Sequence, residues 1–171
     1  MLKENFKVAV PEFPDRKTSI TAYGAVKNVY DDDTGRINAR VINEAIKSMS
    51  SQGGGTVVIP QGVWMTSPIR LLSGVRLYLE RGAVLKFTKN KKDYPLVITN
   101  YEGQECIRTV SPISADGAEN IAISGYGVID GSGDLWRPVK QFKLTERQWD
   151  ALLKKSDYVI ETKEGGLSLI H

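Results

Sequence analysis

The sequence predicts a mainly β protein: a parallel β-helix, or solenoid, whose N-terminal end is covered by a helix. Two observations support this prediction. Short β-rich runs that end in glycine recur along the middle of the chain at intervals of about 20–22 residues. A segment with helical spacing of apolar residues comes before the first of these runs. Each β-rich unit is too short to bury its own apolar face, so successive units must stack into one continuous core.

The repeat follows one pattern: a β-rich run, a glycine turn and a second apolar stretch. Residues 57–59, 77–79 and 121–123 show the whole pattern, and residues 97–99 lie about halfway between the last two runs. We expect all four runs to stack in parallel and in register, about 4.8 Å apart. The structural alternative is an antiparallel sandwich with a turn every ~8–12 residues, which the repeat disfavours.

A helix of about residues 35–50 is predicted ahead of the coils. Its N-cap is Asp33 or Thr34, and the glycines at residues 53–55 end it, since glycine adopts the left-handed conformation without steric cost. We expect this helix to close the N-terminal end of the solenoid by turning one apolar face to the first coil. That face is formed by Ile37, Val41, Ala45 and Ile46.

The end of the chain departs from the repeat. Thr145 and Gln148 form an S/T-x-x-Q capping box at the start of a second helix, and Leu144 is placed to pack on Trp149. We therefore expect three segments: an N-terminal arm and capping helix at 1–55, the first coils at 56–133, and a helical insertion folded onto the β-helix with a truncated end at 134–171. Within the first segment, residues 1–19 are expected to form an extended arm and residues 20–26 a short strand.

The composition is that of an ordinary globular protein, with 41% hydrophobic and 25% charged residues. The formal net charge is +3, the basic and acidic residues are well mixed, and no aromatic residues interleave the local basic cluster, so no nucleic-acid partner is expected. Cys106 is the single cysteine, which excludes an internal disulfide and a cysteine metal cluster. No signal peptide and no run near the ~20 apolar residues of a membrane helix are found, so no membrane partner is expected. One local basic cluster either attracts a polyanion or forms a solvated loop face: Arg81, Lys86, Lys89, Lys91 and Lys92.

Four stretches, taken in order, resemble one known family. They are residues 20–25 with the Asp-rich loop and residues 37–46, the glycine-rich entry at 53–64, the run at 73–85, and residues 121–133 with Trp136 following. Together they resemble glycoside hydrolase family 28, the polygalacturonases and their relatives, over about residues 20–137. The resemblance implies a right-handed parallel β-helix. Trp136-Arg137-Pro138 stands where relatives usually carry a double tryptophan, which leaves the subfamily open.

The resemblance also implies hydrolysis of galacturonic-acid-containing pectic polysaccharide with inversion at the anomeric carbon. That chemistry needs one carboxylic acid at the leaving oxygen and one carboxylate that activates water. The catalytic elements of the family are an Asn-Thr-Asp, an Asp-Asp pair, a Gly-His-Gly and an Arg-Ile-Lys. Three of them do not occur in this sequence, and its adjacent aspartates, residues 31–33, cannot stand in for the Asp-Asp pair because they belong to the capping segment. No catalytic residue is therefore assigned, and the chain alone is expected to be inactive. Residues 31–33 are assigned to helix capping, and Asp130 to a structural hydrogen bond.

Trp136 and Arg137 are the candidate substrate-binding residues. An aromatic ring stacks on a sugar, and an arginine grips a uronate carboxylate with two parallel hydrogen bonds. The alternative for Trp136 is a structural anchor. No cofactor and no metal are expected, and the resemblance implies a secreted or periplasmic location. The open end of the solenoid is expected to favour self-association. Two alternatives stay open: a polysaccharide lyase on the same fold, and a non-enzymatic β-helix that binds carbohydrate or acts as an adhesin.

Overall fold

The computed structural model describes residues 10–134, 136, 141–155, 159–161 and 167–169. The chain separates into two compact units, Met1–Gly131 and Ser132–His171, and each is described by itself. The predicted division at 1–55, 56–133 and 134–171 stays a prediction.

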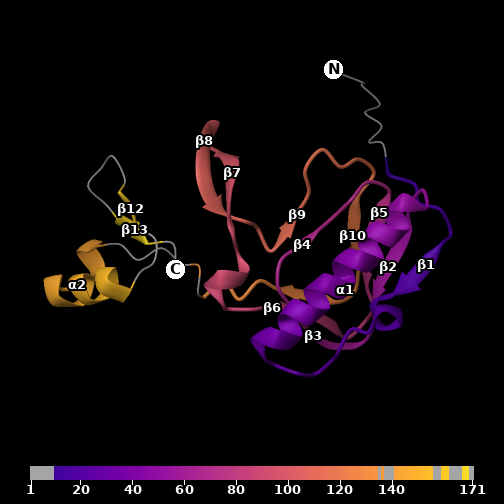
Figure 1. The fold of residues 1–171 in the computed structure, drawn as a ribbon, viewed down its shortest axis with the longest axis horizontal. Coiled ribbons are helices and arrows are strands. Elements are labelled where there is room, and N and C mark those ends of the chain that lie inside the picture. Colours follow the sequence, from indigo (N-terminus) through magenta and orange to yellow (C-terminus); the bar gives the residue numbers. More distant parts are fainter. Residues whose placement is uncertain (1–9, 135, 137–140, 156–158, 162–166, 170–171) are drawn as a thin grey trace, which may run out of the picture. The chain divides into compact units, whose positions relative to one another are not determined.

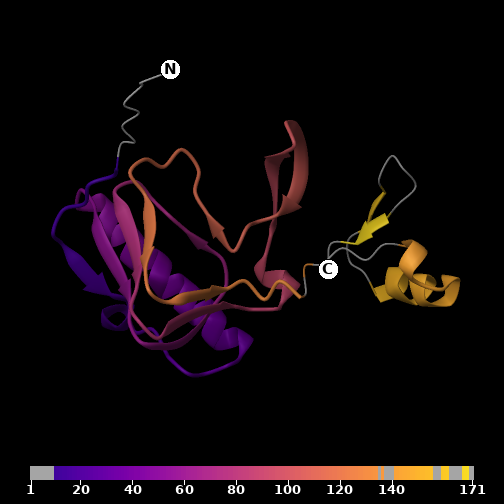
Figure 2. The ribbon, with the colours of Figure 1, turned by 180° about the vertical axis from the view of Figure 1, so that it is seen from behind.

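The first unit consists of stacked β coils, as the repeat predicts. Its strands form three parallel sheets in the orders β1-β2-β5-β10, β3-β6-β11 and β4-β9 (Figures 1 and 2). The fold is therefore a parallel β-helix, with one strand of each coil contributed to each sheet. The strands are β1 (Lys17–Ser19), β2 (Gly55–Ile59), β3 (Gly62–Thr66), β4 (Ile69–Arg70), β5 (Val75–Leu79), β6 (Ala83–Phe87), β9 (Ile113–Ser114), β10 (Ala122–Gly125) and β11 (Val128–Asp130).

The register confirms three of the four predicted runs. Val57 pairs with Leu77, and Leu77 pairs with Ile123, so the runs at 57–59, 77–79 and 121–123 stack in parallel. Side chains alternate along β5 between the core and the outer surface, which gives the two-residue period of a strand with one buried face. The buried members of the first two coils form one continuous core with α1.

Residues 97–99 do not form a coil strand, and the prediction for them is wrong. They belong to β7 (Leu96–Tyr101), which pairs antiparallel with β8 (Gln104–Thr109) in a hairpin that projects from the coils (Figure 1). The loop between the strands is Glu102-Gly103, with φ of 52° and 82°, so both residues adopt the positive φ of a tight hairpin turn. The hairpin interrupts the second coil between β6 and β9. This insertion, and not a missing coil, explains the long interval between the second and third runs.

Helix α1 (Asp32–Ser51) covers the coils and contacts β2 and β3 (Figure 1). Its N-cap is Asp31, not Asp33 or Thr34: the Asp31 carboxylate accepts a 2.7 Å hydrogen bond from the Thr34 amide. The cap lies earlier because the second and third aspartates already have helical backbone and contribute acidic charge to the first turn.

The inner face of α1 matches the prediction at three of its four positions. Val41, Ala45 and Ile46 are buried, whereas Ile37 is 42% exposed. The fully buried residue in that turn is Asn38, whose side chain accepts a hydrogen bond from the Val26 amide and donates to the carbonyls of Val26 and Met65. A buried amide with all these partners ties the preceding loop and β3 to the helix. The predicted glycine stop is confirmed, since the Gly53 and Gly54 amides donate to carbonyls of the last turn.

The segment before the helix differs from its prediction. Residues 20–26 are not a strand: Ile20–Tyr23 form the 3₁₀ helix η1, capped by Ser19 and ended by Gly24 at φ 87°. The Ser19 side chain accepts from the Thr21 amide, so local capping bonds satisfy the backbone groups that a strand would have paired. The predicted arm contains the short strand β1, which pairs with β2.

The second unit contains η3 (Gln141–Lys143), α2 (Glu146–Lys155) and an antiparallel pair, β12 (Val159–Glu161) with β13 (Leu167–Leu169). The capping box is confirmed: the Thr145 amide donates to the Gln148 side chain, and the Gln148 amide donates to the Thr145 hydroxyl. Trp149 is buried. No helix among the described residues is long and apolar enough to span a membrane.

Candidate functional site

A groove of about 1090 Å³ lies in the first unit, along the short sheet β4-β9. Asn43 and Lys47 of α1 line one side of it, and Val97, Ile98 and Thr99 of β7 line another. Residues of both β4 and β9 line it as well. Three elements that are distant in sequence therefore meet at one concave surface, which is where ligands bind in most proteins.

The floor of the groove is fixed by backbone pairing and by one side chain of the helix. Ile69 pairs with Ile113, and the Leu71 amide donates to the Ser114 carbonyl at 2.8 Å. The Asn43 side chain accepts a 2.8 Å hydrogen bond from the Arg70 amide, which holds β4 against α1.

The hairpin wall is held at its base by a buried polar network. The buried Tyr94 hydroxyl donates to the Thr88 carbonyl at 2.7 Å, and burial raises the pKa of this hydroxyl. The Asp93 carboxylate accepts from the Thr88 hydroxyl at 2.9 Å and forms a 3.0 Å ion pair with Arg36 on α1. The side chain of Asp93 is only 5% exposed. The base of the hairpin is thus tied to the first turns of the helix.

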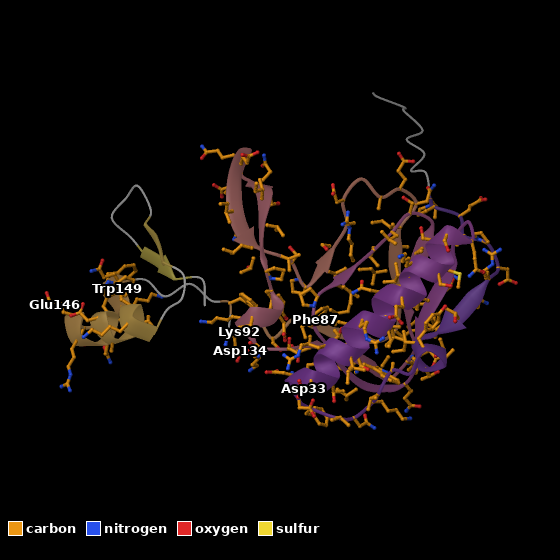
Figure 3. All side chains as sticks on the ribbon, viewed as in Figure 1. Asp33, Phe87, Lys92, Asp134, Glu146 and Trp149 are labelled. Carbon is orange, nitrogen blue, oxygen red and sulfur yellow. The ribbon has the colours of Figure 1, made fainter. Side chains whose placement is uncertain are left out.

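Arg36 joins the hairpin base to the acidic first turn of α1. Its guanidinium donates to Asp33 and to Asp93, and these two hydrogen bonds raise the pKa of Arg36. Asp33 lies at the first turn of α1, and Lys92 lies on the segment that leads into β7 (Figure 3). The Asp32 carboxylate accepts from the Asn90 side chain at 3.0 Å. The aspartate triplet therefore caps the helix and anchors the hairpin.

The charges at the groove surface differ in how they are compensated. Arg70 and Asp116 form a 3.3 Å ion pair whose side chains are 56% and 89% exposed. An exposed pair of this kind contributes little to stability, about 0–1 kcal/mol, and exchanges partners readily. Lys47 is exposed on the helix side of the groove.

The two predicted substrate-binding residues, Trp136 and Arg137, belong to the second unit. Trp136 is half-buried in the second unit, and its amide donates to the Gly133 carbonyl at 3.2 Å. Arg137 lies outside the described residues. The assignment of Trp136 and Arg137 to substrate binding stays a prediction.

The predicted structural role of Asp130 agrees with the observed contacts. The carboxylate forms an ion pair with Lys86 on the neighbouring strand β6. The residues of the predicted basic cluster lie on different elements and differ in their partners. Lys86 is paired with Asp130, Arg81 stacks over the Tyr126 ring at 5.0 Å, and Lys91 and Lys92 lie in η2 (Lys91–Asp93).

The sequence reasoning missed the groove because it treated residues 97–99 as a coil. A usable signal was present. Two short β-prone runs flank Glu102-Gly103, which is typical of a hairpin, and a hairpin inserted in a coil adds a wall beside the adjacent sheet.

The fold and the groove define a right-handed parallel β-helix protein with an insertion beside one of its sheets. The chain is similar to a probable polygalacturonase of Vitis vinifera, with 30% identity over 58% of the chain and 22% of the relative. It is also similar to an exo-poly-alpha-D-galacturonosidase of Dickeya chrysanthemi, with 33% identity over 67% of the chain and 19% of that relative. The chain thus spans about a fifth of the length of these curated relatives. No family model matches the chain.

A solved structure shares the fold. The hyperthermoactive exopolygalacturonase of Thermotoga maritima superimposes with a TM-score of 0.65 and 34% identity, over 75% of this chain and 28% of that one. Over the part that these similarities cover, the chain is similar to polygalacturonases in sequence and to an exopolygalacturonase in both sequence and fold.

Proposed function

We propose that the chain is the N-terminal part of a glycoside hydrolase that cleaves galacturonic-acid-containing pectic polysaccharide. One observation carries the proposal: the first coils share both fold and 34% sequence identity with an exopolygalacturonase. Fold alone does not define function, so the sequence identity within the same coils is the stronger part of this support.

The proposed reaction is inverting hydrolysis, performed on coils beyond those described. It needs a carboxylic acid and a carboxylate about 6.5–9.5 Å apart, on opposite faces of the scissile bond. Three carboxylates of the first unit form ion pairs: Asp93 is paired with Arg36, Asp116 with Arg70 and Asp130 with Lys86. We therefore assign to this chain the closure of the solenoid and contacts to polysaccharide, and no proton transfer.

The resemblance extends the proposal to location and assembly. A secreted or periplasmic protein is expected, and cell fractionation tests this. Trp136 and Arg137 are proposed to contact the polysaccharide. Self-association is proposed through the third coil, where strand edges lack a neighbouring coil among the described residues.

Reducing-sugar release from polygalacturonate tests the function. The 171-residue chain should release none, and a longer gene product that contains it should release product. Nuclear magnetic resonance of the first-formed anomer should show inversion. An unsaturated product would instead establish a lyase, and absence of any product from the longer protein would favour a non-enzymatic carbohydrate-binding β-helix.

A further inference from the structure

We propose that the groove between α1, the β4-β9 sheet and the β7–β8 hairpin binds an acidic oligosaccharide, with Arg70 and Lys47 holding uronate carboxylates. The inference rests on the proposed function, because it names where this chain would hold the polysaccharide. It adds a binding site within the first coils, formed by residues of the cap, the coils and the insertion.

The surface chemistry of the groove suits a sugar. Sugars present apolar C–H faces and a ring of hydroxyl groups. The hairpin wall offers apolar surface at Pro95, Val97 and Ile98, and Ile98 is 72% exposed. Hydroxyl groups line the remaining surface, from Ser67, Thr99, Thr109, Ser111 and Ser114. The volume of about 1090 Å³ lies slightly above the ~300–1,000 Å³ that is usual for ligand pockets, so the groove has room for several sugar rings.

The charge balance favours an anionic sugar over a neutral one. Four charged side chains line the groove: Lys47, Arg70, Asp93 and Asp116. Asp93 is almost fully buried and is already compensated by Arg36, so its charge is not offered to a ligand. Among the described residues, no carboxylate forms an ion pair with Lys47. The groove therefore offers an uncompensated ammonium group.

Arg70 provides the second cation. Its Nη2 lies 3.3 Å from an Asp116 oxygen, so a carboxylate already occupies the position that a uronate would take. Because both side chains are exposed, a ligand carboxylate can displace Asp116 at small cost. Arginine suits this role since its guanidinium holds a carboxylate through two parallel hydrogen bonds. Asp116 thus competes with the ligand, and its removal should strengthen binding.

The test is titration calorimetry of the 171-residue chain with trigalacturonate at low ionic strength. Arg70→Ala should weaken binding by about tenfold, the loss of one charged hydrogen-bonding partner, and Lys47→Ala should weaken it by a similar factor. Asp116→Asn should strengthen binding by about threefold. The fully methyl-esterified trisaccharide, which lacks the carboxylates, should bind at least about tenfold more weakly than trigalacturonate.

A matched pair on the same helix supplies the control. Arg40 and Glu44 form an exposed 3.1 Å ion pair on α1, and neither lines the groove. Arg40→Ala and Glu44→Gln should leave trigalacturonate binding unchanged. All the substituted residues are exposed, so the variants should melt near the parent temperature and report binding alone.

Several outcomes would overturn the inference: no binding by the parent, equal binding of the methyl ester, no effect of Arg70→Ala, or weaker binding after Asp116→Asn. Its failure is distinguishable from failure of the proposed function. If the longer protein cleaves polygalacturonate but the groove variants bind trigalacturonate as tightly as the parent does, the inference is overturned and the proposed function stands. If binding in the groove depends on the ligand's charge but the longer protein cleaves nothing, the inference stands and the proposed hydrolase function is overturned.

Discussion

Side chains at paired positions of successive coils stack into rows that face the core. The side chains of the first two coils are buried, whereas those of the third coil in the same rows are partly exposed. Val57 and Leu77 are fully buried, whereas Ile123, which pairs with Leu77, is 44% exposed. A second row repeats the difference: Trp64 and Leu85 are buried, and Ile129 is 41% exposed. Position in the row does not by itself bury a side chain. Each layer of the solenoid is buried by the layer on either side of it, or by α1 at the capped end.

The largest expected effect is at the capped end. Ile46→Asp should destabilise the chain by about 3–5 kcal/mol, because it places an unpaired carboxylate at a fully buried position of α1. Ile37→Asp on the same helix is the control and should cost less than about 1 kcal/mol, since that position is 42% exposed. Urea unfolding followed by circular dichroism measures both. Equal losses for the two variants would mean that α1 is not a cap.

Two neighbouring positions of one row, Leu77 and Ile123, provide the next comparison. Leu77→Ala should cost about 2–5 kcal/mol, from lost burial and the cavity left in the core. Ile123→Ala, one coil further on, should cost only about 1 kcal/mol or less because the side chain is partly exposed. Thermal unfolding of the two variants and the parent tests this. An Ile123→Ala loss as large as that of Leu77→Ala would show that the third coil is covered.

The smallest effect concerns the helix cap. Hydrogen bonds from the Thr34 amide and hydroxyl lower the pKa of Asp31 below the ordinary value of 3.8. Because the folded pKa is depressed, the contribution of the cap is fully present above 3.8 and is lost as pH falls through the lower folded value.

Asp31→Asn keeps an oxygen that accepts the Thr34 hydrogen bond but does not titrate. The difference in unfolding free energy between parent and variant should therefore shift against the parent as pH falls below 3.8. Urea unfolding across this pH range measures the difference, and a pH-independent difference would contradict the assignment of Asp31 as the cap.

The sequence predicted the features that depend on local patterns repeated along the chain. The strand runs at 57–59, 77–79 and 121–123, the helix that covers the coils and the Thr145–Gln148 capping box all follow from spacing, caps and glycine turns. The sequence-based prediction was wrong where one sequence pattern is compatible with two local structures. The short β-prone run at 97–99 suits a coil strand and a hairpin strand equally, and the choice depends on the turn at Glu102-Gly103.

The groove could not be predicted because its walls meet only in three dimensions. Asn43 on α1 and Arg70 on β4 are 27 residues apart, and Arg36 and Asp93 are 57 residues apart. Nothing in the local sequence of any of these residues indicates its partner. The sequence showed which catalytic elements are absent, but not where the described coils form a concave surface.

The register of the coils is the central claim, and engineered disulfides test it directly. Tyr78 pairs with Ser124 in the structure, whereas an unbroken repeat of about 20 residues would pair Tyr78 with Ile98. Two double variants in a Cys106→Ser background separate these registers: Tyr78→Cys with Ser124→Cys, and Tyr78→Cys with Ile98→Cys. Neighbouring strands bring paired Cα atoms about 4.8 Å apart, which is within disulfide range. Under mild oxidation the first variant should form an intramolecular disulfide and the second should not, and the reverse result would contradict the fold described for this chain.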